Sequence, residues 1–265
     1  VKKYIDLFYR KYEKRFETEN LHYEKVGKQL VLFAFEKPGG RDSYTLQIDK
    51  RKRNLIEEIK KLVKDLNKRI KEDTKTLPQI YFDKHLYLPL LLQSKKIDKI
   101  SPAGLVESEK EFVIGLREYL KRNKDRFSEV EVFLLRNHPK SGVGFFNLSG
   151  FYPDFIMWIK NGKEQRMVFI DPKGLEHTKG LDDEKIVFAG FKPPNSPETI
   201  TIKDIEKNLG SKVKNIKLES FILSKTPYKK LIEGGTEPLS KDEYINHHVL
   251  FLEDQGWPER LFVSV

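Results

Sequence analysis

The stretch FYPDFIMWIKNGKEQRMVFIDPKGL, residues 151–175, decides the fold because it reads as two buried strands joined by a tight turn. Its segments 153–160 and 166–171 are apolar at successive positions, as the central strands of a sheet are. Between them, KNGK at 160–163 contains Asn-Gly, the strongest short-range signal for a β-hairpin. The stretch therefore predicts a hairpin in the middle of a sheet.

Two loops are compatible with this hairpin, and they differ in which residues face each other. With the loop at 161–162, Asp154 lies opposite Phe169. With the loop at 162–163, Asp154 lies opposite Asp171. In both cases the two aspartates point to the same face, because a register shift of two preserves side-chain parity.

These two carboxylates and a nearby lysine form a candidate site. Lys173 lies two residues beyond Asp171 and shares its face if the extended conformation continues. Carboxylates on neighbouring strands lie roughly 5 to 8 Å apart and repel each other, more so where water is excluded. A divalent cation would relieve this repulsion, and hard oxygen ligands favour magnesium or manganese. Alternatively, Asp154 caps a turn after Pro153, and Asp171 forms an ordinary ion pair with Lys173.

A third carboxylate lies on the helix predicted at 105–122. The apolar stripe of this helix contains Leu105, Phe112, Val113, Leu116 and Leu120. Glu109 falls at the centre of that stripe, where an acid needs a partner because burying an unpaired carboxylate is costly. Glu109 could complete the outer shell of the metal. Alternatively, it favours the positive end of the helix dipole.

Composition restricts the chemistry and suggests a partner. The 265 residues contain no cysteine, which excludes disulfides and thiolate metal sites. No apolar run reaches the ~18 to 20 residues of a membrane span, so we expect a soluble, cytoplasmic protein. The first hundred residues hold 25 Lys and Arg against 15 Asp and Glu, and carry all of the net charge of +10. This excess favours a polyanionic partner, although a surface rich in Lys and Glu is an equally good reading.

The pattern predicts two regions, a basic α+β extension at 1–100 and an α/β domain at 101–265. In the first region we expect helices at 3–17 and 52–72, and strands at 22–36, 43–49, 78–82 and 86–92. In the second, the hairpin is expected together with helices at 105–122 and 203–209 and strands at 129–136 and 215–224. This order predicts a mixed central sheet covered by helices on both faces. Residues 227–265 show no clear pattern, and the start at Val1 within a helical segment suggests a piece of a longer protein.

Together, Glu109, Pro153-Asp154 and Asp171-Pro172-Lys173 resemble the motif of the PD-(D/E)xK nuclease superfamily. The resemblance covers roughly residues 103–226 and implies the restriction-endonuclease-like core, with the element order αβββαβ. Further segments are similar to the C-terminal endonuclease region of the restriction subunit of type III restriction enzymes and of helicase-nuclease fusions: LYLPLL, LVESEKEFV, GVGFFNLSGFYPDFIMWI, DPKGL and FILSKTPY.

The resemblance implies roles for these residues. Asp154 and Asp171 would be ligands of Mg²⁺ or Mn²⁺. Pro172 and Glu109 would also belong to the metal site, where Glu109 would have a supporting acidic role. Lys173 would orient or polarise the attacking water. The sequence has DPK where the family more commonly has ExK. This departure shortens the acid and removes a backbone donor at Pro172.

The resemblance also implies partners. They are double-stranded DNA, a modification (methyltransferase) subunit, and an N-terminal helicase/ATPase region that would use ATP; no GxxxxGK[ST] loop occurs in this sequence. Phosphate contacts are expected from two loops, through the side chains of Arg136, His138, Lys140, His177 and Lys179. The basic cluster at 50–53 is a further candidate. For each of these, a solvated turn or helix start is the alternative.

The sequence therefore predicts a magnesium-dependent endonuclease domain that hydrolyses DNA phosphodiester bonds in restriction-modification defence. A second hypothesis is a non-catalytic module that binds nucleic acid or docks subunits. A third, a cation-dependent phosphohydrolase of small substrates, leaves the basic region unexplained.

Overall fold

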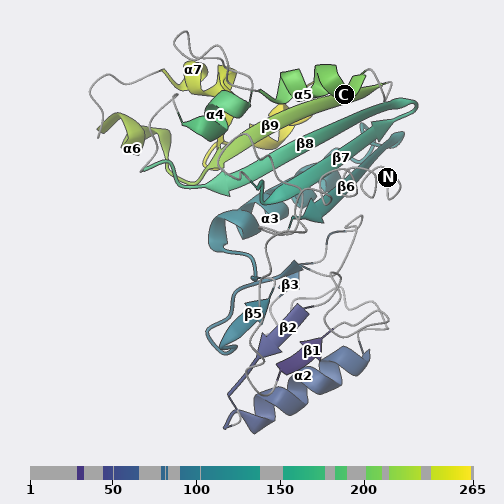
Figure 1. The fold of residues 1–265 in the computed structure, drawn as a ribbon, viewed down its shortest axis with the longest axis vertical. Helices are drawn as coiled ribbons and strands as arrows, with labels where there is room; N and C mark the ends of the chain where they lie inside the picture. Colours follow the sequence, from purple (N-terminus) through teal and green to yellow (C-terminus); the bar gives the residue numbers. More distant parts are fainter. Residues whose placement is uncertain are drawn as a thin grey trace. The chain divides into compact units, whose positions relative to one another are not determined.

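A computed structural model describes most of the chain, in twelve stretches (Figure 1): residues 29–32, 44–49, 51–65, 79–80, 82, 90–101, 103–137, 152–176, 183–189, 201–210, 215–233 and 240–263. The chain divides into two compact units, Val1–Lys110 and Glu111–Val265. Within the described stretches, no helix is both long and apolar enough to cross a membrane.

In its described residues, the first unit contains two small antiparallel sheets and the helix α2. Its three-stranded sheet has the order β1-β2-β5, and the other sheet pairs β3 with β4. The bounds are β1 Gln29–Leu32, β2 Tyr44–Gln47, α2 Arg53–Asp65, β3 Gln79–Ile80, β4 Leu90–Leu91 and β5 Lys99–Ser101. Leu46 of β2 and Ile59 of α2 are fully buried. The strands and the helix expected between 22 and 92 are thus present where the structure describes them, and the helix expected at 3–17 lies outside the described residues.

The second unit follows the predicted element order and then adds to it. Helix α3 (Glu107–Arg122), which begins within the first unit, leads into β6, β7 and β8, and α4 and α5 lead into β9. The bounds are β6 Val130–Arg136, β7 Phe155–Asn161, β8 Glu164–Lys173, α4 Glu184–Phe188, α5 Ile202–Gly210 and β9 Ile216–Ser224. The order expected between 105 and 224 is therefore confirmed, with α4 as an additional short helix.

The five strands of the second unit lie side by side in chain order, from β6 at one edge to β10 (Val249–Phe251) at the other. β6, β7 and β8 form an antiparallel meander, and β9 and β10 run parallel to β8. β8 is the central strand and is buried on both faces from Arg166 to Pro172. This explains its unbroken apolar pattern in the sequence.

The register of the β7–β8 hairpin decides between the two predicted loops. Phe155 pairs with Ile170, and Asn161 pairs with Glu164, which leaves a loop at 162–163. Gly162 has a φ of 55°, in the left-handed region that glycine adopts without cost. The second of the two alternatives is therefore the observed one.

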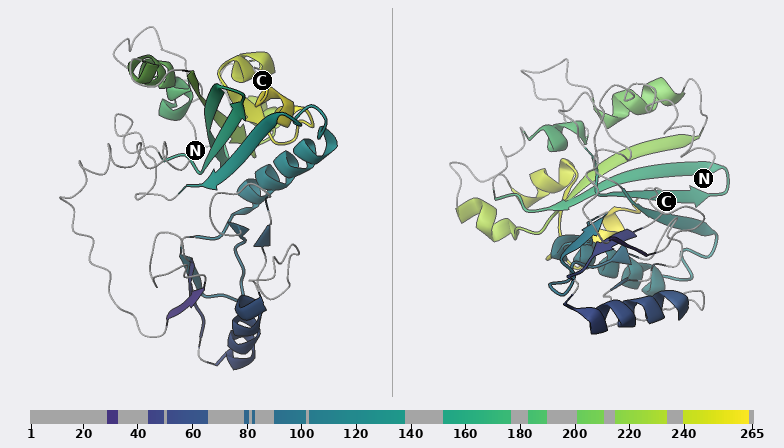
Figure 2. Two further views of the ribbon diagram at one scale, coloured as in Figure 1. Left: turned by 90° about the vertical axis from the view of Figure 1, so that its right-hand side faces the viewer. Right: turned by 60° about the horizontal axis from the view of Figure 1, so that its bottom comes forward.

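Helices cover both faces of the five-stranded sheet (Figures 1 and 2). On one face, the ring of Phe112 in α3 lies with its centroid 4.9 Å from that of Phe155 in β7. The opposite face carries α4 and α5, and Ile186 of α4 packs there with Ile222 of β9. The second unit is thus a mixed α/β sheet flanked by helices, as expected.

The C-terminal segment, whose sequence shows no clear pattern, adds elements on both faces of the sheet. It forms three short helices in addition to β10: α6 Tyr228–Glu233, α7 Lys241–Asn246 and α8 Trp257–Arg260. Trp257 of α8 packs on Phe112, with ring centroids 5.7 Å apart. The close approach requires Gly115, because a Cβ there would lie 2.7 Å from the indole ring of Trp257.

Candidate active site

The predicted site residues gather at one edge of the five-stranded sheet. β6 ends there at Arg136, β7 begins there at Phe155, and β8 ends there at Lys173. Asp154 immediately precedes β7, and continuation of the register places it opposite Asp171. The strand ends thus bring together the two aspartates that the sequence separates by seventeen positions.

Asp171 is almost completely buried and forms a short ion pair. Its side chain is 5% exposed, and its Oδ2 accepts a hydrogen bond of 2.6 Å from the Nζ of Lys185. Lys185 belongs to α4, which covers this face of the sheet. A buried carboxylate needs such a charged donor, because an unpaired charge away from water is strongly destabilising. Lys185 lies outside the sequence motif and was not predicted as a site residue.

Lys173 forms a second ion pair with the start of the same helix. Its Nζ lies 3.6 Å from the Oδ1 of Asp183, and both side chains are about one-fifth exposed. Asp183 is the N-cap of α4, where its side chain accepts a hydrogen bond from the backbone N–H of Lys185. We call Asp171, Lys173, Asp183 and Lys185 the charged quartet. In it, two charges of β8 are matched by two opposite charges of α4.

Asp154 is held by the end of β6. The Nη1 of Arg136 lies 3.4 Å from the Oδ1 of Asp154 and donates to its carbonyl oxygen at 3.1 Å. Asn137 donates its backbone N–H to the same carbonyl at 2.9 Å and its side-chain amide to the Pro153 carbonyl at 2.7 Å. Asn137 is buried and, like Lys185, was not identified from the sequence. Arg136, expected to contact phosphates, is therefore also a partner of Asp154.

The end of β8 is fixed by residues that follow β9. Lys225 donates its backbone N–H to the carbonyl of Lys173 at 2.9 Å. The backbone N–H of Leu175 donates to the hydroxyl of Thr226 at 3.0 Å, and the hydroxyl of Ser224 donates to the Thr226 carbonyl at 2.8 Å. The bonds to the Lys173 carbonyl and to the Leu175 N–H hold the backbone at Lys173 and directly after it.

Glu109 is buried in the first turn of α3, and its Oε2 accepts a hydrogen bond of 2.9 Å from the backbone N–H of Val106. This contact is one half of a capping box, in which the third helical residue binds the N-cap N–H. It supports the interpretation in which Glu109 stabilises the start of the helix. A role beside the two aspartates stays a prediction.

The other predicted site residues divide into two groups. Pro172 is buried in β8 and pairs with Leu223 of β9, so it lies at the site as expected, and its place in a metal set stays a prediction. The remaining predicted phosphate contacts lie outside the described residues: His138, Lys140, His177 and Lys179.

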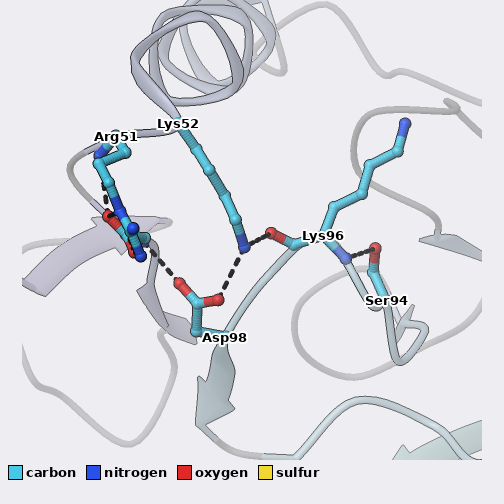
Figure 3. A network of polar contacts seen from close by, with 6 residues as sticks. Arg51, Lys52, Ser94, Lys96 and Asp98 are labelled. Carbon is cyan, nitrogen blue, oxygen red and sulfur yellow. Dashed lines mark hydrogen bonds and ion pairs between the residues drawn. The ribbon is translucent and has the colours of Figure 1, made fainter.

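The basic cluster at 50–53 is partly neutralised by acids of the first unit (Figure 3). Arg51 pairs with Asp49 at 2.6 Å, and Lys52 pairs with Asp98 at 2.7 Å. The hydrogen bond from Arg51 lowers the pKa of Asp49 to about 2. Lys52 similarly holds the pKa of Asp98 below its usual range. We call these four residues the exposed network; its bases are already engaged, and Lys50 lies outside the described residues.

The donor set at the sheet edge fits a small hard cation that keeps part of its water. Magnesium is commonly held by one or two carboxylates together with waters and substrate phosphates. Asp154 and Asp171 supply two carboxylates at facing positions, one of them shielded from water. Among the described residues, no group of three or more His, Cys, Asp and Glu side chains could hold a metal ion. The sheet edge thus offers two carboxylates, which is compatible with a partly hydrated magnesium ion.

Comparison with known proteins adds no further information. No protein-family model, no curated protein and no solved structure matches the chain. The geometry of the site and the sequence motif are therefore the features that bear on function.

Proposed function

We propose that the second unit is a magnesium-dependent endonuclease domain of the PD-(D/E)xK superfamily, acting on double-stranded DNA. The observation that carries this proposal is the β7–β8 register, which puts Asp154 opposite Asp171 with Lys173 two residues further along β8. The element order α3, β6, β7, β8, α5, β9 supports a restriction-endonuclease-like core, since it repeats the αβββαβ order of that fold.

In this proposal Asp154 and Asp171 hold the cation, with manganese as an alternative to magnesium. The bound cation would lower the pKa of a coordinated water and neutralise charge on the phosphate. Lys173 contributes a positive charge that stabilises the attacking hydroxide and the scissile phosphate; as an ammonium it is not itself a base. Arg136 and Asn137 keep Asp154 in place through their hydrogen bonds.

The wider setting is proposed from the resemblance alone. The domain would belong to the restriction subunit of a type III restriction enzyme and act in the cytoplasm. A helicase/ATPase region of the same protein would use ATP, and a separate modification subunit would read the DNA sequence. Arg136 and the segments 136–144 and 176–180, for which the sequence predicts loops, would contact DNA phosphates.

One experiment tests the enzymatic part. The chain is incubated with supercoiled plasmid and Mg²⁺ or Mn²⁺, and nicking is followed on gels beside metal binding measured by calorimetry. We expect Asp154→Ala, Asp171→Ala and Lys173→Ala to lose nicking, and the two aspartate variants to lose metal binding as well. Asp125→Ala, a change of an exposed acid after α3, is the control and should behave as the unchanged chain. Metal binding that survives both aspartate changes would contradict the proposed ligands.

The second candidate is a non-catalytic module with the same fold. It is favoured by one observation, namely that the acids of the site each have a basic partner within the chain. Such a module would bind DNA without nicking it, with or without metal, and would lose little affinity when Asp171 is replaced.

A further inference from the structure

The short helix α4 contributes an ammonium group to the buried acid of the proposed metal site. The Nζ of Lys185 lies 2.6 Å from the Oδ2 of Asp171, a distance typical of a charge-assisted hydrogen bond. An ammonium and a divalent cation at the same carboxylate repel each other strongly where water is scarce. We propose that Lys185 is the counter-ion of Asp171 in the metal-free chain, and that a divalent cation must displace it. This inference rests on the proposed function.

The burial of the two side chains supports an exchange of partners. Asp171 is only 5% exposed and sits on the central strand, so its carboxylate cannot move far. The side chain of Lys185 is 34% exposed and can turn toward solvent. The body of α4 stays anchored, because Ile186, Val187 and Phe188 are buried in the core. The lysine can therefore leave the carboxylate without unfolding the helix.

The second ion pair of the charged quartet makes it possible to distinguish a specific effect of Lys185 on metal binding from a general effect of charge near the site. Asp183 faces Lys173 at 3.6 Å and caps α4. It therefore holds the start of α4 and the proposed catalytic ammonium without touching the ligand position of Asp171. Removal of Lys185 should free the metal site, whereas neutralisation of Asp183 should not.

Apparent metal affinity measures this competition directly. When a group of the protein occupies the ligand, the apparent Kd rises by the inverse of the fraction of molecules in which the ligand is open. Removing the competing ammonium should therefore tighten metal binding. The effect belongs to the metal-free chain and needs neither DNA nor turnover to be observed.

The experiment is calorimetric titration of Mn²⁺ into the chain without DNA, for the unchanged protein, Lys185→Met, Lys185→Arg and Asp183→Asn. We expect Lys185→Met to bind Mn²⁺ about tenfold more tightly, the other two variants to bind with unchanged affinity, and the number of sites to stay constant. Lys160→Met is the matched control: it removes one lysine and one ion pair, with Glu131, at the opposite end of the sheet. Lys185→Gln, which keeps a hydrogen-bond donor, replaces the Met variant if that one does not fold.

Each outcome has one meaning. Unchanged or weaker Mn²⁺ binding in Lys185→Met, beside normal binding by the unchanged chain, overturns the competition and leaves the proposed function intact. Equal tightening in Lys160→Met also overturns it, because the effect would then reflect net charge. Absence of binding in every variant rejects the proposed metal site and the competition with it.

Discussion

The charged quartet and the exposed network each consist of two acids and two bases, yet their surroundings differ. In the exposed network the side chains of Lys52 and Asp98 are 38% and 46% exposed, and that of Arg51 is 91% exposed. In the quartet, Asp171 is 5% exposed and stands between two sheet strands. Exposed pairs of this kind stabilise a fold by ~0 to 1 kcal/mol, whereas removing one partner of a buried pair costs several-fold more. Burial, more than the number of ion pairs, therefore decides which charges matter.

The charged quartet and the exposed network should differ most in their effect on nicking activity. Asp171→Asn should lower plasmid nicking by at least about a thousandfold, because the neutral amide no longer holds the cation. Asp98→Asn changes an acid of the exposed network and should leave nicking unchanged. Rates from plasmid assays with Mg²⁺ check both. A rate for Asp171→Asn within about tenfold of the unchanged chain would show that Asp171 is not a ligand.

Stability gives the next largest difference. Lys185→Met leaves the Oδ2 of the buried Asp171 carboxylate without its lysine donor and should lower the free energy of unfolding by about 2 kcal/mol. Lys52→Met, which removes an exposed pair, should change the free energy of unfolding little. Urea denaturation of the metal-free chain followed by circular dichroism measures both. Equal losses would mean that burial does not separate the two groups.

The neutral side chain of Asn137 provides a further test of the effect of burial on stability. Asn137→Ala removes the side-chain donor to the Pro153 carbonyl at a buried position, and should lower the free energy of unfolding by about 1 to 2 kcal/mol. Asn123→Ala removes a similar bond, to the carbonyl of Tyr119, where water can take its place. It should cost less in the same denaturation experiment. A larger loss at Asn123 would contradict the importance of burial.

The smallest expected effect is the titration of the exposed network. Because Asp49 has a pKa of about 2 in the folded chain and an ordinary value of 3.8, it stabilises the folded state above pH 3.8. That contribution decreases as the pH falls through about 2. NMR titration of the Asp49 carboxyl should show the low pKa, and Arg51→Ala should return it toward 3.8, because the hydrogen bond from Arg51 is the main cause. An unchanged pKa in Arg51→Ala would assign the shift to another neighbour.

The local features of the fold could be predicted from the sequence. The hairpin at 151–175 follows from an apolar pattern and an Asn-Gly turn, and the parity of Asp154 and Asp171 holds for either loop. The choice between the loops depends on pairing along the whole length of β7 and β8, which no local pattern contains. The order of the expected elements between 105 and 224 needed only periodicity and turn residues, whereas β5 and α4 were not predicted.

Residues that act over longer distances could not be predicted. Lys185 lies on a helix of five residues that Asp183 caps, and this helix is too short to show an apolar period. The partners of both residues are ten or more positions away. β10 has three residues, and its partner β9 lies across two helices in the sequence. Thr226 and Asn137 support the site through hydrogen bonds that only the folded chain defines. One local signal was readable: Asp183 precedes a short apolar run, as an N-cap does.

The central position of β8 has a consequence for motion at the site. β7 pairs with this strand as far as Ile170, and β9 pairs with it as far as Lys173, so the amides of the part paired on both edges should exchange with deuterium only when the sheet itself opens. Asp171 and Lys173 lie at the end of this strand, where β9 still pairs with them, and we expect their backbone to move little. Any adjustment to a cation or a phosphate must come from side chains and from α4. In the proposed active site, the β8 side would therefore stay fixed, and only the side that carries α4 would change when a ligand binds.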